Sequence, residues 1–319
     1  MPNVLITLHL YEENLAKLRE RFPRFHFHML ARKETPTDEQ LAWADVLMGH
    51  IDPAWLPKLT NIKYIHSASA GIDHILPEAM RLYGQALPVS NSAGVYGIPI
   101  AEHLLALMLA LSHRIGHSVR NMPAGRWGGV PRCREFHGST VGIVGYGDIG
   151  SHLAALLPPF ACTTLAFKRT PVERPANVHE LLYGEAGLDE LVSRSDHVAI
   201  CLPGSPATQG LFHRERLTRM KPGACLVNIG RGSIVDHEAL ADLIEGGHLG
   251  GAGLDVTNPE PLPPEHRLWQ LPGVIITPHI SGPTAPHWER RLAEWFAENL
   301  AAWAAGEPLP GAVDKVHLY

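Results

Sequence analysis

The chain has 319 residues, of which 45% are hydrophobic and 18% charged, and its formal net charge is −5. A chain of this length can form two domains, and this composition is typical of a soluble globular protein rather than a disordered one. The negative net charge argues against a nucleic-acid surface, which usually needs a basic face. The longest strongly apolar stretch, Leu104–Leu111, is too short to span a membrane.

The N-terminus, the cysteines and the histidines exclude further classes. A strand-like run, Asn3–Leu8, begins at once, without a basic segment or cleavage site, which predicts a cytoplasmic protein. Cys133, Cys162, Cys201 and Cys225 have no C-x-x-C spacing and fit neither a zinc site nor a disulfide framework. Cys201 and Cys225 lie in apolar strand-like runs, so we expect their thiols to be buried. The 20 histidines include no H-E-x-x-H or similar pair, and we expect no metal site.

Strand-like runs alternate with helix-like segments along most of the chain. The first series is expected at Asn3–Leu8, Phe25–Leu30, Val46–Gly49, Tyr64–Ser67 and Val89–Asn91. The second series is expected at Val141–Val144, Thr163–Phe167, His197–Leu202, Ala224–Ile229, Gly253–Val256 and Val274–Thr277. Such alternation predicts two parallel sheets flanked by helices.

Two apolar segments read as longer helices. Ile100–Ser112 follows Pro99, which suits a first helical turn, and we expect it to cross between the domains. Pro286–Ala305 carries apolar residues at helical spacing, which a packing stripe explains. We expect this helix to return the chain to the first domain.

A glycine-rich turn opens the second series. Its residues are Gly145, Tyr146, Gly147, Asp148, Ile149 and Gly150, between an apolar run and a helix-like segment. The first glycine lets the backbone turn sharply, the second leaves room for a pyrophosphate, and the third lets the helix pack close to the strand. The helix N-terminus offers N–H groups to the phosphates. The context predicts a dinucleotide site rather than an ordinary tight turn.

The end of the next strand bears on which dinucleotide binds. Thr163–Phe167 is followed by Lys168, Arg169 and Thr170, and the first acid is Glu173. An acid at this strand end binds the ribose hydroxyls of NAD, whereas a 2′-phosphate carries about −1.5 to −2 charges and attracts a basic pair. The alternative is a solvated basic strand end. We predict NADP(H) over NAD(H).

Three polar residues follow other strands of the same series. Arg231, Glu260 and His279 come after the third-last, second-last and last of these strands. Each alone has an ordinary structural explanation. Because parallel strands place their carboxyl ends at one edge, where ligands bind, together they predict a site.

These residue types suit the reduction of a 2-keto acid. Hydride transfer places negative charge on the carbonyl oxygen, and a histidine is a natural proton donor near neutrality. A glutamate beside His279 would favour its protonated form. An arginine fork can hold the substrate carboxylate with two hydrogen bonds.

The chain resembles the D-isomer specific 2-hydroxyacid dehydrogenases, including the NADPH-using glyoxylate and hydroxypyruvate reductases. The motifs that carry the resemblance are Ser69–His74, Ala101–His103, His137–Gly150, Cys201–Pro203 with Thr208, Asn228–Asp236, Gly251–Val256 with Glu260–Pro263, and Thr277–His279. The likeness covers nearly the whole chain and is densest from His137 to Gly282.

The resemblance implies an α/β fold with two domains. A central Rossmann domain, a doubly wound parallel sheet, is expected at residues 99–284. A smaller flavodoxin-like α/β substrate domain is expected at residues 1–98 and 285–319. The resemblance also implies a homodimer formed through the cofactor domain, and Trp127 is interpreted either as a residue near a subunit contact or pocket mouth or as a packing residue.

The resemblance also implies residue roles. Arg231 would bind the substrate carboxylate, His279 would be the acid/base, and Glu260 would pair with it. Backbone N–H groups around Ala70 and Gly71 would help to hold the carboxylate. The cofactor-binding residues implied beyond the glycine turn and Lys168, Arg169 and Thr170 are Leu202, Pro203, Thr208, Ile229, Arg231, Asp255 and His279.

The sequence therefore predicts an NADPH-dependent reductase of small 2-keto acids that forms D-2-hydroxy acids and uses NAD more weakly. Glyoxylate and hydroxypyruvate are the first expected substrates, followed by pyruvate and phenylpyruvate. The chain ends at Tyr319 without the regulatory domain of many phosphoglycerate dehydrogenases, which argues against that function. The alternatives are a dehydrogenase of another donor, such as phosphite or formate, and a cofactor-sensing, corepressor-type binding protein.

Overall fold

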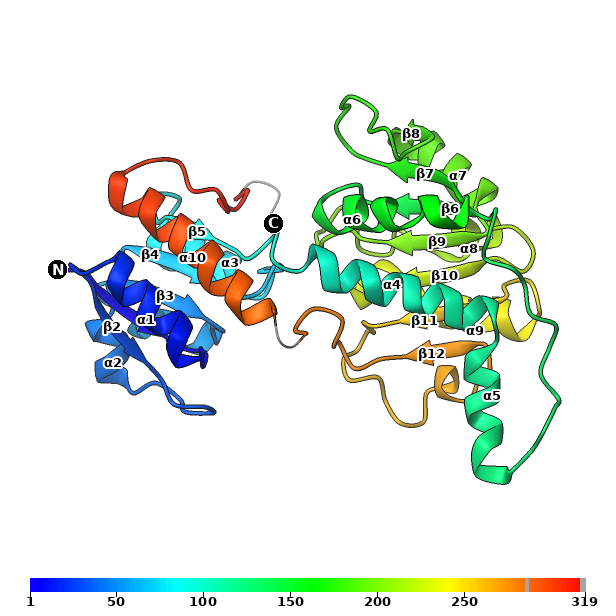
Figure 1. Cartoon of the computed structure of the whole chain (residues 1–319), viewed down its shortest axis with the longest axis horizontal. Coiled ribbons are helices and arrows are strands. Elements are labelled where there is room, and N and C mark those ends of the chain that lie inside the picture. The colour runs from blue at the N-terminus through cyan, green and yellow to red at the C-terminus, as the bar shows by residue number, and fades with distance from the viewer. Residues whose placement is uncertain (285–286, 316–319) are drawn as a thin grey trace. The chain divides into compact units, whose positions relative to one another are not determined.

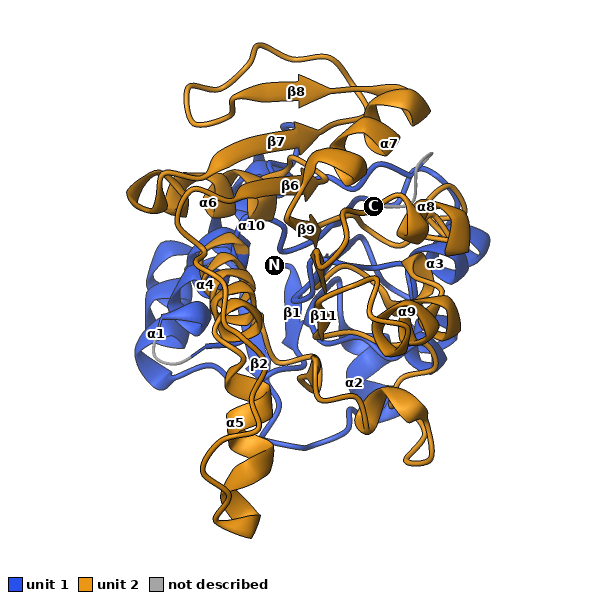
Figure 2. Ribbon diagram, turned by 90° about the vertical axis from the view of Figure 1, so that its right-hand side faces the viewer, with its two compact units in different colours: residues 1–96, 283–319 blue, residues 97–282 orange. Residues whose placement is uncertain are grey.

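The computed structural model describes residues 1–284 and 287–315. Two compact units form, Met1–Tyr96 with Pro283–Tyr319 (unit 1) and Gly97–Gly282 (unit 2), coloured separately in Figure 2. The predicted domain boundaries follow residues 98 and 284, whereas the units divide after residues 96 and 282. Pro286, the expected start of the C-terminal helix, lies outside the described residues.

Unit 1 contains a five-stranded parallel sheet in the order β2-β1-β3-β4-β5 (Figure 1). Its strands are β1 (Asn3–Ile6), β2 (His26–Met29), β3 (Val46–Gly49), β4 (Tyr64–Ser67) and β5 (Val89–Ser90). Its helices are α1 (Glu12–Arg21), α2 (Asp38–Trp43), η1 (Pro53–Lys58), α3 (Leu76–Tyr83) and α10 (Trp288–Ala305). This strand order is the flavodoxin-like one, as the resemblance implied.

Local sequence explains how unit 1 forms. The inner strands β3 and β4 are buried throughout, whereas edge strand β2 exposes His26 and His28 and turns Phe27 and Met29 inward. Helix α2 begins with a capping box, in which Thr37 and Gln40 satisfy each other's backbone N–H groups. Each fully buried leucine of this core stabilises the fold by roughly 1.5–3 kcal/mol.

Unit 2 contains a seven-stranded parallel sheet in the order β12-β11-β10-β9-β6-β7-β8. Its strands are β6 (Thr140–Val144), β7 (Thr163–Phe167), β8 (Glu180–Leu182), β9 (His197–Ile200), β10 (Cys225–Asn228), β11 (Gly251–Leu254) and β12 (Val274–Ile276). Its main helices are α4 (Gly97–Ser112), α5 (Ile115–Asn121), α6 (Asp148–Leu156), α7 (Gly184–Arg194), α8 (Arg214–Thr218) and α9 (His237–Glu245), and its 3-10 turns are η2 (Met122–Ala124), η3 (Pro158–Phe160), η4 (Gly232–Ile234) and η5 (Arg267–Trp269). The order is that of a doubly wound Rossmann sheet, which confirms the predicted fold class.

The structure departs from the sequence analysis in two elements of unit 2. Strand β8 was missed, because it has three residues, of which only Leu182 is fully buried, and leaves little apolar pattern. Helix α4 starts at Gly97 rather than Ile100 and takes Pro99 into its first turn. It belongs to unit 2 along its whole length rather than crossing between the domains, because it packs on α6 and on strands β10–β12 (Figure 1).

The cysteine thiols and the apolar helices were two further subjects of prediction. The four cysteines are free; Cys225 is buried and Cys201 half-buried, and burial raises the pKa of the Cys201 thiol to about 12. No single helix in residues 1–284 and 287–315 is long and apolar enough to cross a membrane. By length and composition alone, the bent pair Gly97–Ser112 and Ile115–Ala124, at 69° to each other, meets that test together.

Candidate active site

The glycine turn joins β6 to α6 at the carboxyl edge of the unit 2 sheet. Gly145 has φ +105°, and a Cβ there would lie 2.8 Å from the Cys201 carbonyl oxygen. A Cβ on Gly150 would lie 2.4 Å from the Gly145 carbonyl oxygen. A Cβ on Gly147 would meet no atom within 4 Å. The fold therefore requires the first and third glycines, whereas the second leaves an open space.

That open space suits a phosphate group. Gly147 is the N-cap residue of α6 and offers no side-chain cap to the first-turn N–H groups. Helix N-termini bind phosphates through such N–H groups and through the positive end of the helix dipole. The turn between β6 and α6 therefore fits the pyrophosphate of a dinucleotide.

The basic end of β7 lies beside the same turn. The Lys168 Nζ donates a hydrogen bond of 2.9 Å to the Tyr146 carbonyl oxygen, which places the ammonium group against the glycine turn. Lys168 is half-buried, whereas Arg169 and Thr170 are exposed. Of the predicted basic residues after β7, Lys168 thus contacts the glycine turn.

His279 and Glu260 form a close pair. The His279 Nδ1 lies 2.6 Å from the Glu260 Oε1, and the two side chains are 49% and 42% exposed. Because a carboxylate only accepts hydrogen bonds, Nδ1 carries the proton that is shared with Glu260. The other ring nitrogen, Nε2, is then the atom that can exchange a proton with a substrate.

The loop that carries Arg231 packs between two other loops of this edge. A Cβ on Gly230 would lie 2.4 Å from the Leu202 carbonyl oxygen, and one on Gly232 would lie 2.0 Å from the Thr257 carbonyl oxygen. The buried Asn228 side chain bonds both the Gly230 N–H and the Arg231 carbonyl. The fold therefore fixes the Arg231 backbone beside the segment that leads to Glu260.

The remaining predicted residues divide between the units. The Thr208 hydroxyl donates to the Pro203 carbonyl at 2.8 Å, which closes the turn after β9, and Ile229 is buried directly after β10. Ala70 and Gly71 follow β4 in unit 1, where the Asn91 side chain donates to the Ala70 carbonyl at 2.8 Å.

Sequence reasoning gave no role to His103, Thr277 or Asn228. All three residues lie inside the motifs that carry the family resemblance. Their position within those motifs is the only sequence signal that could have indicated a role for them. The Thr277 hydroxyl donates to Asp255 at 2.6 Å and lies 3.0 Å from the His103 Nε2. These polar contacts lie next to His279.

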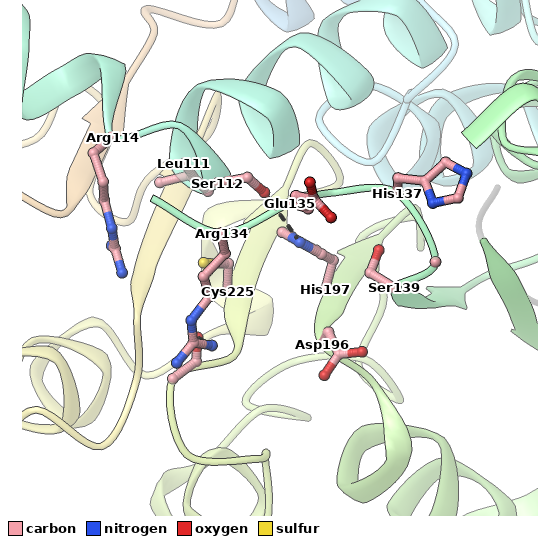
Figure 3. A pocket seen from close by; sticks show the side chains of 12 residues that line it. Leu111, Ser112, Arg114, Arg134, Glu135, His137, Ser139, Asp196, His197 and Cys225 are labelled. Carbon is pink, nitrogen blue, oxygen red and sulfur yellow. Dashed lines mark hydrogen bonds between the residues drawn. The ribbon is translucent and has the colours of Figure 1, made fainter. Parts of the chain in front are cut away.

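A cavity of about 240 Å³ lies at the opposite, amino edge of the same sheet (Figure 3). Two of its polar residues bond the backbone: Arg134 donates to the Gly223 carbonyl at 2.9 Å, and Arg114 donates to the Gly250 carbonyl at 2.7 Å. The buried Arg114 Nε and His197 Nδ1 have no hydrogen-bond partner among the described residues. His197 contacts Ser112 at 3.3 Å, and burial lowers its pKa to about 4. This cavity lacks a glycine turn and an exposed acid–base pair, and we place the candidate site at the carboxyl edge.

Within residues 1–284 and 287–315, no group of three or more histidine, cysteine, aspartate or glutamate side chains could hold a metal ion.

The doubly wound sheet, the glycine turn and the helix behind it define unit 2 as a dinucleotide-binding domain of the Rossmann type. The sequence model described as "D-isomer specific 2-hydroxyacid dehydrogenase, NAD binding domain" matches residues 105–281. The chain belongs to the D-isomer specific 2-hydroxyacid dehydrogenase family.

Three relatives illustrate the range of this family. A glyoxylate reductase of Thermofilum pendens is 35% identical over 278 residues, which cover 85% of this chain and 80% of that protein. A D-3-phosphoglycerate dehydrogenase of Mycobacterium leprae is 34% identical over 83% of this chain but only 49% of its own length, so the chain spans about half of that relative. An NADPH-dependent glyoxylate/hydroxypyruvate reductase of Sinorhizobium meliloti, solved with NADP and sulfate, has 25% identity and a TM-score of 0.82 over 100% of both chains.

Proposed function

We propose that this protein reduces small 2-keto acids to D-2-hydroxy acids with NADPH. The observation that carries the proposal is the 2.6 Å pair of His279 and Glu260, held at the sheet edge that also bears the glycine turn and the Arg231 loop. Glyoxylate and hydroxypyruvate are the first substrates. Relatives named for these activities match this chain over about 80% of their own length. Pyruvate and phenylpyruvate follow.

The chain's own residues suit a nicotinamide dinucleotide. The open space at Gly147 receives the pyrophosphate, and residues 202–208 and 229 border the same edge. When bound, the nicotinamide supplies the hydride that reduces the substrate carbonyl. The protein's part is to hold the keto acid, to stabilise charge on its oxygen and to deliver a proton.

Each catalytic side chain has one task in this proposal. Arg231 holds the substrate carboxylate through two N–H groups of its guanidinium. His279 donates its Nε2 proton to the carbonyl oxygen as negative charge develops there. Glu260 accepts the hydrogen bond from the His279 Nδ1–H at 2.6 Å and so fixes the orientation of the ring.

NADPH is proposed over NADH because of the end of β7. Lys168 and Arg169 occupy the position where NAD-dependent proteins carry an acid, and the Lys168 ammonium group lies against the glycine turn. A 2′-phosphate gains attraction from both cations and meets no acid before Glu173. NAD then binds more weakly, through the shared parts of the dinucleotide.

A cytoplasmic homodimer completes the proposal. Exposed apolar side chains gather on α5 and the residues after it, with Ile115 48%, Val119 55%, Met122 73% and Trp127 102% exposed. Such a concentration of exposed apolar side chains is typical of a contact surface. This supports pairing of two copies through the cofactor domain.

A screen of 2-keto acids with NADPH and NADH side by side tests the function. We expect oxidation of NADPH with glyoxylate and hydroxypyruvate, a D-configured product from hydroxypyruvate, and slower turnover with NADH. D-3-phosphoglycerate with NAD or NADP, phosphite and formate are included as donors. Cofactor binding without turnover of any substrate would instead support the binding-protein alternative.

A further inference from the structure

His279 has an unusual backbone conformation. Its φ is +53°, in the left-handed region that residues with a side chain rarely adopt. Such a conformation costs on the order of 1 kcal/mol and persists only where the surroundings hold it. The backbone that aims the catalytic imidazole therefore needs a device that keeps it in place.

Asp255 is the centre of that device. Its backbone oxygen accepts from the His279 N–H at 2.9 Å, its Oδ1 accepts from the Ile280 N–H at 3.0 Å, and its Oδ2 accepts from the Ser281 N–H at 3.2 Å. Three successive N–H groups thus converge on one residue, as in the backbone nests that bind anions. Asp255 is 1% exposed, so water does not compete for these bonds.

The charge of this carboxylate is maintained by its neighbours. Burial raises the pKa of Asp255, but hydrogen bonds from Ser281, from Thr277 and from the backbone of Ile280 outweigh burial and hold that pKa below its ordinary value. An ionised Asp255 accepts at both oxygens and anchors the loop at two points.

A second layer extends this anchor to helix α4. The Thr277 hydroxyl lies 2.6 Å from the Asp255 Oδ1 and 3.0 Å from the His103 Nε2. A hydroxyl has one hydrogen, and the carboxylate can only accept, so Thr277 donates to Asp255. The His103 Nε2 must then donate to Thr277, which fixes the ring in its Nε2–H form.

We infer that His103 and Thr277 are positioning residues that hold the left-handed loop of His279 through the carboxylate of Asp255. The hydrogen bonds link His103 on α4 to Thr277 after β12 and Thr277 to Asp255 after β11. Asp255 in turn accepts hydrogen bonds from the loop that bears His279. This inference rests on the proposed function. Its catalytic consequence follows because a displacement of about 1 Å in a reacting group can cost about 100-fold in rate.

Replacement of Thr277 by valine tests the inference, because valine has nearly the same shape but no hydroxyl. We expect kcat for glyoxylate to fall by about 10- to 100-fold in T277V. KM and the Kd of NADPH should stay within about threefold, because the glycine turn, Lys168 and Arg231, which are assigned to the phosphates and to the keto acid carboxylate, lie outside this network. T277S, which restores the hydroxyl, should recover most of kcat. T218V is the matched control, since the exposed Thr218 hydroxyl only bonds the Arg214 carbonyl.

His103 supplies a second, independent test. H103A should lower kcat in the same direction by several-fold, and H103Q, whose amide can donate to Thr277, should recover part of it. The nitrogen-15 NMR shifts of His103 should report the Nε2–H form in the wild-type protein and lose that preference in T277V. Thermal unfolding of each variant shows whether the fold is intact; if T277V is unfolded, the H103A and H103Q pair decides.

The outcomes separate this inference from the proposed function. If H279A abolishes turnover while folded T277V and H103A keep wild-type kcat, the positioning role is wrong and the proposed function stands. If H279A itself keeps wild-type turnover, the assignment of His279 is wrong. If T277V raises KM and leaves kcat unchanged, Thr277 serves substrate binding rather than the His279 loop.

Discussion

The two edges of the unit 2 sheet carry the same kinds of side chain and use them differently. At the carboxyl edge, His279 and Glu260 bond each other and both are about half exposed. At the amino edge, Arg114 and Arg134 bond backbone carbonyls, and His197 is 6% exposed. The acid–base pair at the first edge is open to a ligand, whereas the guanidinium groups at the second edge bond the backbone and its histidine is buried.

The two edges also differ in whether their open space coincides with groups that can act on a ligand. The amino edge has the 240 Å³ cavity (Figure 3), yet Arg134 bonds the Gly223 carbonyl before β10 and Arg114 bonds the Gly250 carbonyl before β11. The carboxyl edge has a glycine whose missing side chain serves no packing need. An exposed acid–base pair beside unexplained open space is here a better guide to function than cavity volume.

The largest expected effect concerns the carboxyl edge. H279A removes the proton donor, and we expect kcat for glyoxylate to fall by roughly 10²- to 10⁴-fold while NADPH still binds. Steady-state kinetics and fluorescence titration with NADPH measure the two effects. The control is H213A, which breaks a surface histidine–glutamate pair of 2.7 Å and should leave kcat unchanged. A loss of less than about tenfold in H279A would contradict a direct role.

The next effect concerns cofactor choice at the same edge. K168D reverses the charge beside the glycine turn, and we expect kcat/KM for NADPH to fall by about 10- to 100-fold, while that for NADH changes little or rises. K58D reverses the charge of a surface lysine of unit 1 that pairs with Asp38 at 2.6 Å; it is the control and should preserve the ratio. An unchanged NADPH/NADH ratio in K168D would remove the basis for the NADP assignment.

The glycine turn allows fold and ligand to be distinguished. G147A adds a methyl group to open space, so the melting temperature should stay within a few degrees while the Kd for NADPH rises by about tenfold or more. G150A forces a methyl group against the Gly145 carbonyl and should destabilise the fold by about 1–3 kcal/mol. Thermal unfolding and NADPH titration of both variants test this, and equal effects on stability would contradict it.

The smallest effect concerns the amino edge and depends on pH. Burial lowers the pKa of His197 to about 4, below its ordinary value of 6.5, so the unfolded chain binds more protons between these values. Stability should therefore fall as pH falls from about 6.5 towards 4. H197Q should weaken this pH dependence by an amount on the order of 2 kcal/mol without changing kcat near neutrality.

Urea unfolding near pH 7 and near pH 5 measures that dependence. It should be reduced rather than abolished in H197Q, because burial also lowers the pKa of His66 to about 3 and that of His237 to about 4. If H197Q lowers kcat at neutral pH, the amino edge has a catalytic role that the structure does not suggest.

Much of the fold was predictable because its signals are local. Buried parallel strands leave runs of apolar residues, so β3, β4 and β7 were predicted at their observed bounds. Strand β8, with one fully buried residue, left no such run. The start of α4 was misplaced because Pro99 is compatible with a first turn as well as with a preceding loop.

The amino-acid sequence by itself predicted the glycine turn, the ends of several strands and hence the sheet edge at which we propose that Arg231, Glu260 and His279 act. These follow from backbone preferences and apolar periodicity, which act over a few residues. Only the tertiary structure decided that Asp255 holds the three N–H groups after Pro278, and that His103 reaches Thr277 across 174 positions. Such contacts depend on strand register and helix packing, which bring distant side chains within hydrogen-bonding distance only once the sheet has formed.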